Sequence, residues 1–121
     1  MRLLICGGRG YAKADNVRRA VLHWHAVHPD LVVICGYDPA DPKFQGADQL
    51  AYRIAKMANI RCEPFPAEWK KYGKSAGPRR NQRMLDEGRP DHVLAFPGGR
   101  GTRDMVKRAK GASVEVTELE T

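Results

Sequence analysis

Long hydrophobic runs are absent from the sequence. The longest apolar stretches cover residues 3–6 and 31–35, far short of the ~20 residues that a membrane-spanning helix needs. The apolar stretch before Gly7 is also shorter than the core of a signal peptide. We therefore expect neither a membrane protein nor a secreted one.

Cysteine is scarce as well. The three cysteines form no CxxC pair and are odd in number, which argues against a disulfide framework or a cysteine-rich zinc site and favours the reducing cytoplasm. Three histidines share one predicted helix at positions 23, 25 and 28, but no cysteine or carboxylate completes a tetrahedral ligand set. We expect no metal.

The motifs of the common nucleotide enzymes are missing too. There is no GxxxxGK[ST] phosphate loop, and Gly8-Arg9-Gly10 lacks the third glycine of the dinucleotide-binding motif. ATP hydrolysis and redox chemistry with NAD(P) are therefore disfavoured, and no cofactor is expected.

What the sequence does contain is an alternation of apolar runs with segments of helical period, which is typical of a parallel sheet with crossover helices. Strands are predicted at 3–6, 31–35, 60–65, 92–96 and 112–116, and helices at 15–28, 47–58, 78–85 and 102–111. The chain length suits one domain, residues 1–121. The expected fold class is α/β, a doubly wound domain of about five parallel strands with helices on both faces.

Helical spacing and end signals make sharper predictions inside these elements. Asp15 and Thr102 are placed as N-caps of their helices. The inward positions are expected to include Val27 in the first helix and Met57 in the second. Residues 67–75 show no period, so we expect a basic loop there.

Eight of the twelve glycines lie in three loops that follow predicted strands. In an open parallel sheet such loops line the ligand crevice, and glycine lets successive backbone N–H groups converge on an anion beside a helix N-terminus. Two phosphate-binding loops are therefore predicted, at 7–11 and 97–102, with Arg9 and Arg100 in them. Tight strand-to-helix turns also need glycine, so packing is the alternative explanation.

The net charge is +7, and most of the excess is local. Residues 66–83 hold six Lys or Arg residues against one acidic residue, Glu68. Trp69 and Tyr72 lie in this segment, where an exposed ring can stack on a nucleobase or on single-stranded nucleic acid; alternatively, Trp69 covers the edge of the sheet. The local excess favours a small phosphorylated ligand, with nucleic acid as the alternative partner.

Two longer motifs carry a family resemblance. Residues 65–84 (FPAEWKKYGKSAGPRRNQRM) and 95–110 (AFPGGRGTRDMVKRAK), together with Gly46-Ala47-Asp48, resemble motifs of the YspA-type, YpsA-related SLOG family. The resemblance covers nearly the whole chain. It implies a Rossmann-like sheet of order 3-2-1-4-5 and a site for a nucleotide or a nucleotide-derived phosphosugar. Relatives in this superfamily often dimerise, so the resemblance also leaves a homodimer open.

The predicted phosphate- and ligand-binding residues come from these motifs and from the first glycine loop. They are Gly7, Gly8, Arg9, Gly46, Asp48, Arg79, Arg80, Asn81, Pro97, Gly98, Gly99, Arg100, Gly101 and Thr102.

The wider superfamily contains the LOG (Lonely Guy) phosphoribohydrolases, which release a base from a nucleoside 5′-monophosphate. Arg80 and Met84 match the arginine and methionine of their RKxxM motif, but Met105 stands where their PGGxGTxxE loop has its catalytic glutamate. Asp48 and Asp104 are the carboxylates that could replace it, with Arg80 assisting. Asp104 is one position away from Met105, so we expect it to point elsewhere, by about 100° around the helix.

A departure from the family follows the second strand. Gly36 and Gly46 are separated by nine residues, where the family has only a few. The extra residues 37–45 are either a lid over the ligand, with Tyr37 or Phe44 stacking on a base, or a plain surface insertion.

Three functions are thus expected. The first is binding or sensing of a nucleotide-derived ligand, such as a nucleoside phosphate or ADP-ribose. The second is LOG-type hydrolysis of an N-glycosidic bond, so enzymatic activity stays open. The third is single-stranded nucleic-acid binding, because the DNA-processing protein A family uses a related Rossmann domain.

Overall fold

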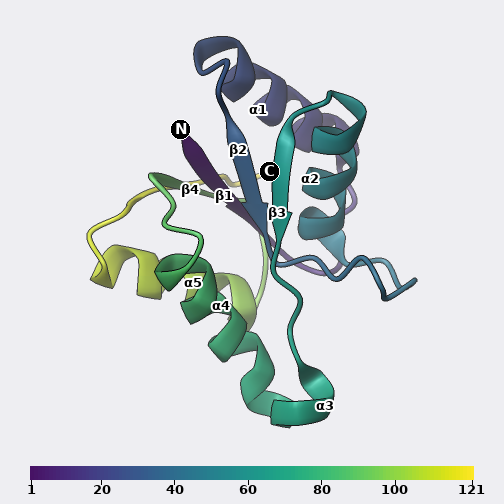
Figure 1. The fold of residues 1–121 in the computed structure, drawn as a ribbon, viewed down its shortest axis with the longest axis vertical. Coiled ribbons are helices and arrows are strands. Elements are labelled where there is room, and N and C mark those ends of the chain that lie inside the picture. Colours follow the sequence, from purple (N-terminus) through teal and green to yellow (C-terminus); the bar gives the residue numbers. More distant parts are fainter.

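The computed structural model describes residues 1–121 and contains one five-stranded parallel sheet flanked by helices (Figure 1). The strands are β1 (Arg2–Cys6), β2 (Val32–Cys35), β3 (Arg61–Pro64), β4 (His92–Ala95) and β5 (Glu115–Glu118). The helices are α1 (Ala14–Val27), α2 (Gly46–Met57), α3 (Trp69–Tyr72), the 3-10 turn η1 (Gly73–Ser75), α4 (Ala76–Asp86) and α5 (Arg100–Gly111). The strand order β3-β2-β1-β4-β5 confirms the α/β class and the order implied by the resemblance.

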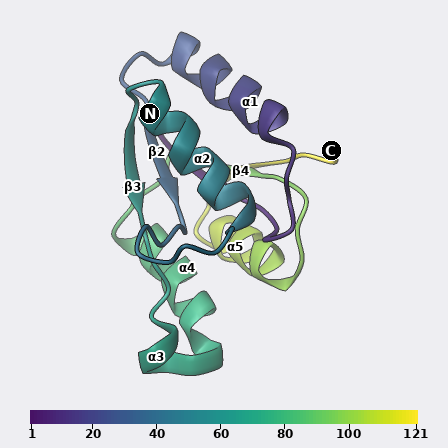
Figure 2. The ribbon, with the colours of Figure 1, turned by 90° about the vertical axis from the view of Figure 1, so that its right-hand side faces the viewer.

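Each face of the sheet is covered by its own pair of helices. Leu3 and Ile5 of β1 pack with residues of α1 and α2, while Leu4 and Cys6 pack on the other face with residues of α4 and α5. This alternation follows from the period of two along a strand, and a strand covered on both faces is apolar throughout. Figure 2 shows α1 and α2 next to each other on their face. The predicted doubly wound arrangement is confirmed.

Helix α2 lies on the sheet through small side chains. Its fully buried alanines are Ala47, Ala51 and Ala55. Met57 is 88% exposed, so its predicted inward position is wrong; it lies six residues after Ala51, about 120° around the helix. Val27 in α1 is 60% exposed and wrong for the same reason, because it follows the buried Val21 by six residues.

The helix starts also differ from the predicted ones. Helix α1 begins at Ala14 and α5 at Arg100, so Asp15 and Thr102 lie inside the first turns and cap neither helix. The Thr102 side chain packs against Gly98 instead, where a β-carbon on the glycine would overlap it.

Two segments were predicted with the wrong local structure or the wrong bounds. Residues 67–75 contain α3 and η1 rather than a loop without structure; neither element buries a residue, so no apolar period marks them. In Figure 1, α3 extends away from the sheet. Strand β5 starts three residues later than predicted because residues 112–114 bond back to the end of α5. None of the helices combines the length and the apolar composition that a membrane-spanning segment needs.

Candidate ligand-binding cleft

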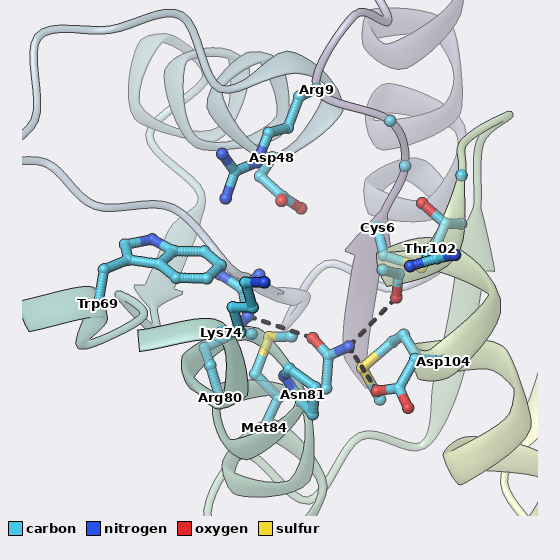
Figure 3. Close-up of a pocket in the computed structure, with 18 residues that line it drawn as sticks. Cys6, Arg9, Asp48, Trp69, Lys74, Arg80, Asn81, Met84, Thr102 and Asp104 are labelled. Atoms are coloured by element: carbon cyan, nitrogen blue, oxygen red, sulfur yellow. Dashed lines mark hydrogen bonds between the residues drawn. The ribbon is translucent and has the colours of Figure 1, made fainter. Parts of the chain in front are cut away.

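A cleft of about 690 Å³ opens beyond the carboxyl ends of β1 and β4, beside the starts of α2, α4 and α5. This is the edge where parallel α/β sheets bind ligands. The sequence-predicted site residues that line it are Gly7, Gly8, Arg9, Asp48, Trp69, Arg80, Asn81, Gly99, Arg100, Gly101, Thr102 and Asp104. Those that lie outside its lining are Gly46, Tyr72, Arg79, Pro97 and Gly98. Figure 3 shows Trp69 on one side of the cleft and Thr102 and Asp104 on the other.

The cleft also contains residues that the sequence analysis did not select as site residues. They are Cys6, Lys74, Gly77, Pro78, Met84 and Met105. Gly77 and Met84 share a face of α4 with Arg80 at spacings of three and four residues, a signal that could have found them. Lys74 has no such signal apart from its charge. Burial raises the pKa of the Cys6 thiol well above its usual range, which disfavours the reactive thiolate form.

The two glycine loops pack on each other. The Gly8 N–H donates to the Pro97 carbonyl at 2.9 Å, and a β-carbon on Gly98 would overlap the Gly8 nitrogen. A β-carbon on Gly7 would come within 2.6 Å of the β-carbon of Ala47. Close packing therefore accounts for these three glycines.

Gly99 and Gly101 are different, because no atom lies within 4 Å of where their β-carbons would be, and both line the cleft. The backbone N–H groups of residues 98–102 make no hydrogen bond within the chain. They lie at the N-terminus of α5, where unpaired N–H groups and the helix dipole favour an anion. The loop at 97–102 can therefore bind a phosphate, with Arg100 beside it in the cleft lining.

Arg80 joins the ends of two strands. Its Nη1 donates to the carbonyls of Gly36 and Phe65, which directly follow β2 and β3, and its Nε donates to Asn81 Oδ1 at 3.1 Å. A β-carbon on Gly36 would overlap the guanidinium, so this contact requires glycine. Burial lowers the pKa of Arg80, and the Asp48 carboxylate opposes that shift. The Nη2 group makes no hydrogen bond within the chain and remains available to a ligand.

Asp104 is engaged by neighbouring side chains. Its Oδ2 accepts hydrogen bonds from Asn81 Nδ2 at 2.9 Å and from Arg108 Nε at 2.8 Å, and Figure 3 marks the first of these. Asp104 and Met105 both line the cleft, so the expectation that Asp104 points elsewhere is wrong. The reason is that the cleft extends between α4 and α5, where successive residues of α5 border it.

Asp48 is the carboxylate of the cleft that receives no side-chain hydrogen bond. Burial raises its pKa to about 6, although Arg80, the Gly36 backbone and Arg9 oppose the shift. Near neutral pH this group is thus an ionised acceptor that a small change of surroundings can protonate. No three His, Cys, Asp or Glu side chains come together in a way that could hold a metal.

Trp69 presents an aromatic surface to the cleft. Its side chain is 45% exposed, and the guanidinium carbon of Arg9 lies 5.0 Å from the ring centroid, a cation–π contact. Tyr72 lies outside the cleft lining, where Arg79 stacks on its ring at 4.4 Å. The structure therefore brings Trp69 into the cleft, whereas Tyr72 lies outside it with Arg79.

Residues 37–45 border a second pocket of about 100 Å³. Phe44 lines this pocket and is 47% exposed. Tyr37 is buried against Tyr52 with ring centroids 4.7 Å apart, so the expectation that it stacks on a base is wrong. Its ring packs in the core and is not free to stack on a ligand.

The sequence pattern of the YspA, cpYpsA-related SLOG family matches residues 1–72, from β1 through α3. The chain belongs to this family. The Gene 61 protein of Mycobacterium phage D29 is similar to it, with 35% identity over 123 residues that cover 95% of this chain and 93% of the phage protein. The likeness to the phage protein therefore continues beyond the 72 residues that the SLOG pattern matches. SLOG membership indicates a nucleotide-related function on a Rossmann-like fold.

Proposed function

We propose that this SLOG protein binds a phosphorylated nucleoside or a related phosphosugar in the cleft, with the phosphate at the N-terminus of α5. One observation carries the proposal: the N–H groups of residues 98–102 have no acceptor within the chain, and Gly99 and Gly101 leave the space beside them open. Phosphate oxygens pair with such groups and interact favourably with the helix dipole.

The rest of the cleft suits the rest of such a ligand. Arg80, Arg100 and Lys74 supply positive charge, and Asp48 can accept a hydrogen bond from a ribose hydroxyl. The exposed ring of Trp69 can stack on the base. The volume of about 690 Å³ falls within the range of roughly 300–1,000 Å³ that is usual for small-molecule sites.

Calorimetric titration of AMP, GMP, CMP, UMP, ADP-ribose and ribose 5-phosphate tests the proposal. Gly101→Asp introduces a carboxylate at the phosphate position, and Gly101→Asn is a neutral control of the same size; both side chains enter open space, so both variants should fold. We expect saturable binding that Gly101→Asp weakens by about tenfold or more relative to Gly101→Asn. The proposal is wrong if none of these compounds binds at millimolar concentration.

Single-stranded nucleic acid is the competing ligand. Titration of an oligonucleotide at several salt concentrations separates the two, because binding to a phosphate backbone weakens steeply with salt. Oligonucleotide binding that free mononucleotides do not displace would favour the nucleic-acid function.

Hydrolysis of an N-glycosidic bond is a second candidate activity. The environment of the Asp48 carboxylate in the cleft favours it. This carboxylate has a raised pKa of about 6 and lies near Arg80, whereas Asp104 is already engaged by Asn81 and Arg108. An ionised Asp48 would stabilise the positive charge that develops on the ribose as the bond to the base breaks. Chromatography of nucleotide incubations should then show free base, and Asp48→Asn should bind nucleotide without releasing base. No free base from the unaltered protein would rule the activity out.

A further inference from the structure

The pocket beside residues 37–45 adjoins the main cleft. Arg9, Asp48, Trp69 and Arg80 line both spaces, so a ligand in the cleft can extend into the pocket. The two spaces differ in size, about 690 Å³ for the cleft against about 100 Å³ for the pocket. The pocket therefore suits one flat ring system and not a second phosphosugar.

Gln45 fixes the backbone of the loop that borders this pocket. Its Oε1 accepts a hydrogen bond from the Asp38 N–H at 2.8 Å, and its Nε2 donates to the carbonyls of Asp38 and Asp41 at 3.1 and 3.3 Å. The Gln45 N–H in turn donates to Oε1 of the buried Gln49 at 3.3 Å. These hydrogen bonds tie the loop to itself and to α2, so it forms a structured wall of the pocket.

Phe44 and Trp69 are the large apolar side chains exposed at this pocket, at 47% and 45%. The other exposed large apolar side chains, Leu22, Val27 and Met57, lie on α1 and α2 and line neither space. Stacking of a solvent-exposed aromatic ring on another planar group is favourable, because it lowers the free energy of the system. Two such rings at one small pocket therefore point to a planar ligand group.

Polar groups border the same pocket. Asp38 and Asp41 use Oδ1 to accept hydrogen bonds from the N–H groups of Ala40 and Lys43, each at 2.9 Å. The Oδ2 atoms of both carboxylates make no hydrogen bond within the chain, and the Lys43 side chain also lines the pocket. These groups can pair with the amino and carbonyl groups at the edge of a nucleobase.

We propose that this pocket is the base subsite of the ligand, and that Phe44, presented by the fixed 37–45 loop, is a specificity-determining residue that stacks on the base together with Trp69. The inference rests on the proposed function, because the base enters the pocket only when a phosphorylated nucleoside occupies the cleft. It adds the place of the base, the pocket beside the 37–45 loop, and a second residue, Phe44, that contacts it.

The experiment compares two kinds of probe on four proteins. The four nucleoside monophosphates AMP, GMP, CMP and UMP, and ribose 5-phosphate, which lacks a base, are titrated into the unaltered chain, Phe44→Ala, Phe44→Tyr and Met57→Ala. Phe44→Tyr keeps the ring, and Met57→Ala removes another exposed apolar side chain of the chain. We expect at least one nucleotide to bind more tightly than ribose 5-phosphate. Phe44→Ala should lower the affinity for that nucleotide about tenfold and leave the affinity for ribose 5-phosphate unchanged. Phe44→Tyr and Met57→Ala should match the unaltered chain.

The possible failures are distinguishable. The base-subsite proposal is wrong if Phe44→Ala binds nucleotides with the affinity of the unaltered chain. It is also wrong if the substitution lowers the affinities for nucleotide and ribose 5-phosphate equally. In both cases the proposed phosphate site still stands. If no probe binds the unaltered chain, the proposed function is wrong and the subsite falls with it. The thermal denaturation midpoint of Phe44→Ala is compared with that of the unaltered chain. Equal midpoints establish that any loss of binding is local and not due to unfolding.

Discussion

The guanidinium of Arg80 lies directly on Gly36, donating to its carbonyl and filling the space that a β-carbon would need. The contact joins α4 to the end of β2 across 44 residues of sequence. Arg80 is thus a structural part of the cleft wall as well as a positive charge beside a ligand. Substitutions at either residue are expected to change stability, and substitutions at Arg80 to change binding too.

Gly36→Ala should destabilise the fold by about 1–3 kcal/mol, because the added methyl group forces the guanidinium out of its place. Urea denaturation measures this loss. Gly111→Ala is the matched control, since no atom lies within 4 Å of its β-carbon position. Equal stability of the two variants would contradict the contact with Arg80.

Asn81→Ala should loosen the junction of α4 with α5. Asn81 is 4% exposed, accepts from Arg80 Nε and donates to the Gly101 carbonyl and to Asp104. Its loss removes three part-buried hydrogen bonds, although Asp104 keeps the one from Arg108, and the expected cost is about 1–3 kcal/mol. Lys107→Ala, an exposed position on α5, should leave the denaturation midpoint unchanged. A midpoint for Asn81→Ala as high as that of the control would refute the role of this side chain.

Asp48 should make the free energy of unfolding depend on pH. Its pKa is about 6 in the folded chain against an ordinary 3.8, so the folded chain holds this proton more tightly than the unfolded chain. The contribution of Asp48 is therefore most favourable below pH 3.8 and is lost as the pH rises through about 6. Asp48→Asn should exceed the unaltered chain in stability above about pH 6, by up to about 3 kcal/mol. The difference between the two proteins at each pH is the measurement, since the lowered pKa values of Glu63 and Asp30 act alike in both.

Trp69→Ala should weaken nucleotide binding about tenfold, because a stacking ring is lost. Tyr72→Ala is the control, since the Tyr72 ring lies outside the cleft under Arg79. Titration of the nucleoside monophosphates measures both. Equal losses in the two variants would show that stacking does not take place in the cleft.

The sequence by itself determined the layered core of this protein. The apolar run 31–35 and the helical spacing that includes Val17 and Val21 are local patterns, and local physics decides strand or helix and which face is buried. The grouping of glycines after strands likewise located the cleft at the correct edge of the sheet, because parallel strands bring their carboxyl ends together.

Only the tertiary structure decided what each site residue does. Gly98 and Gly99 are neighbours, yet one packs on the other glycine loop and one opens to the cleft. Asp104 borders the cleft and Tyr37 does not, against expectation in both cases. These outcomes depend on which distant segments pack together, α4 with α5 and the 37–45 loop with α2. A periodic pattern within one segment does not identify the segment that packs against it.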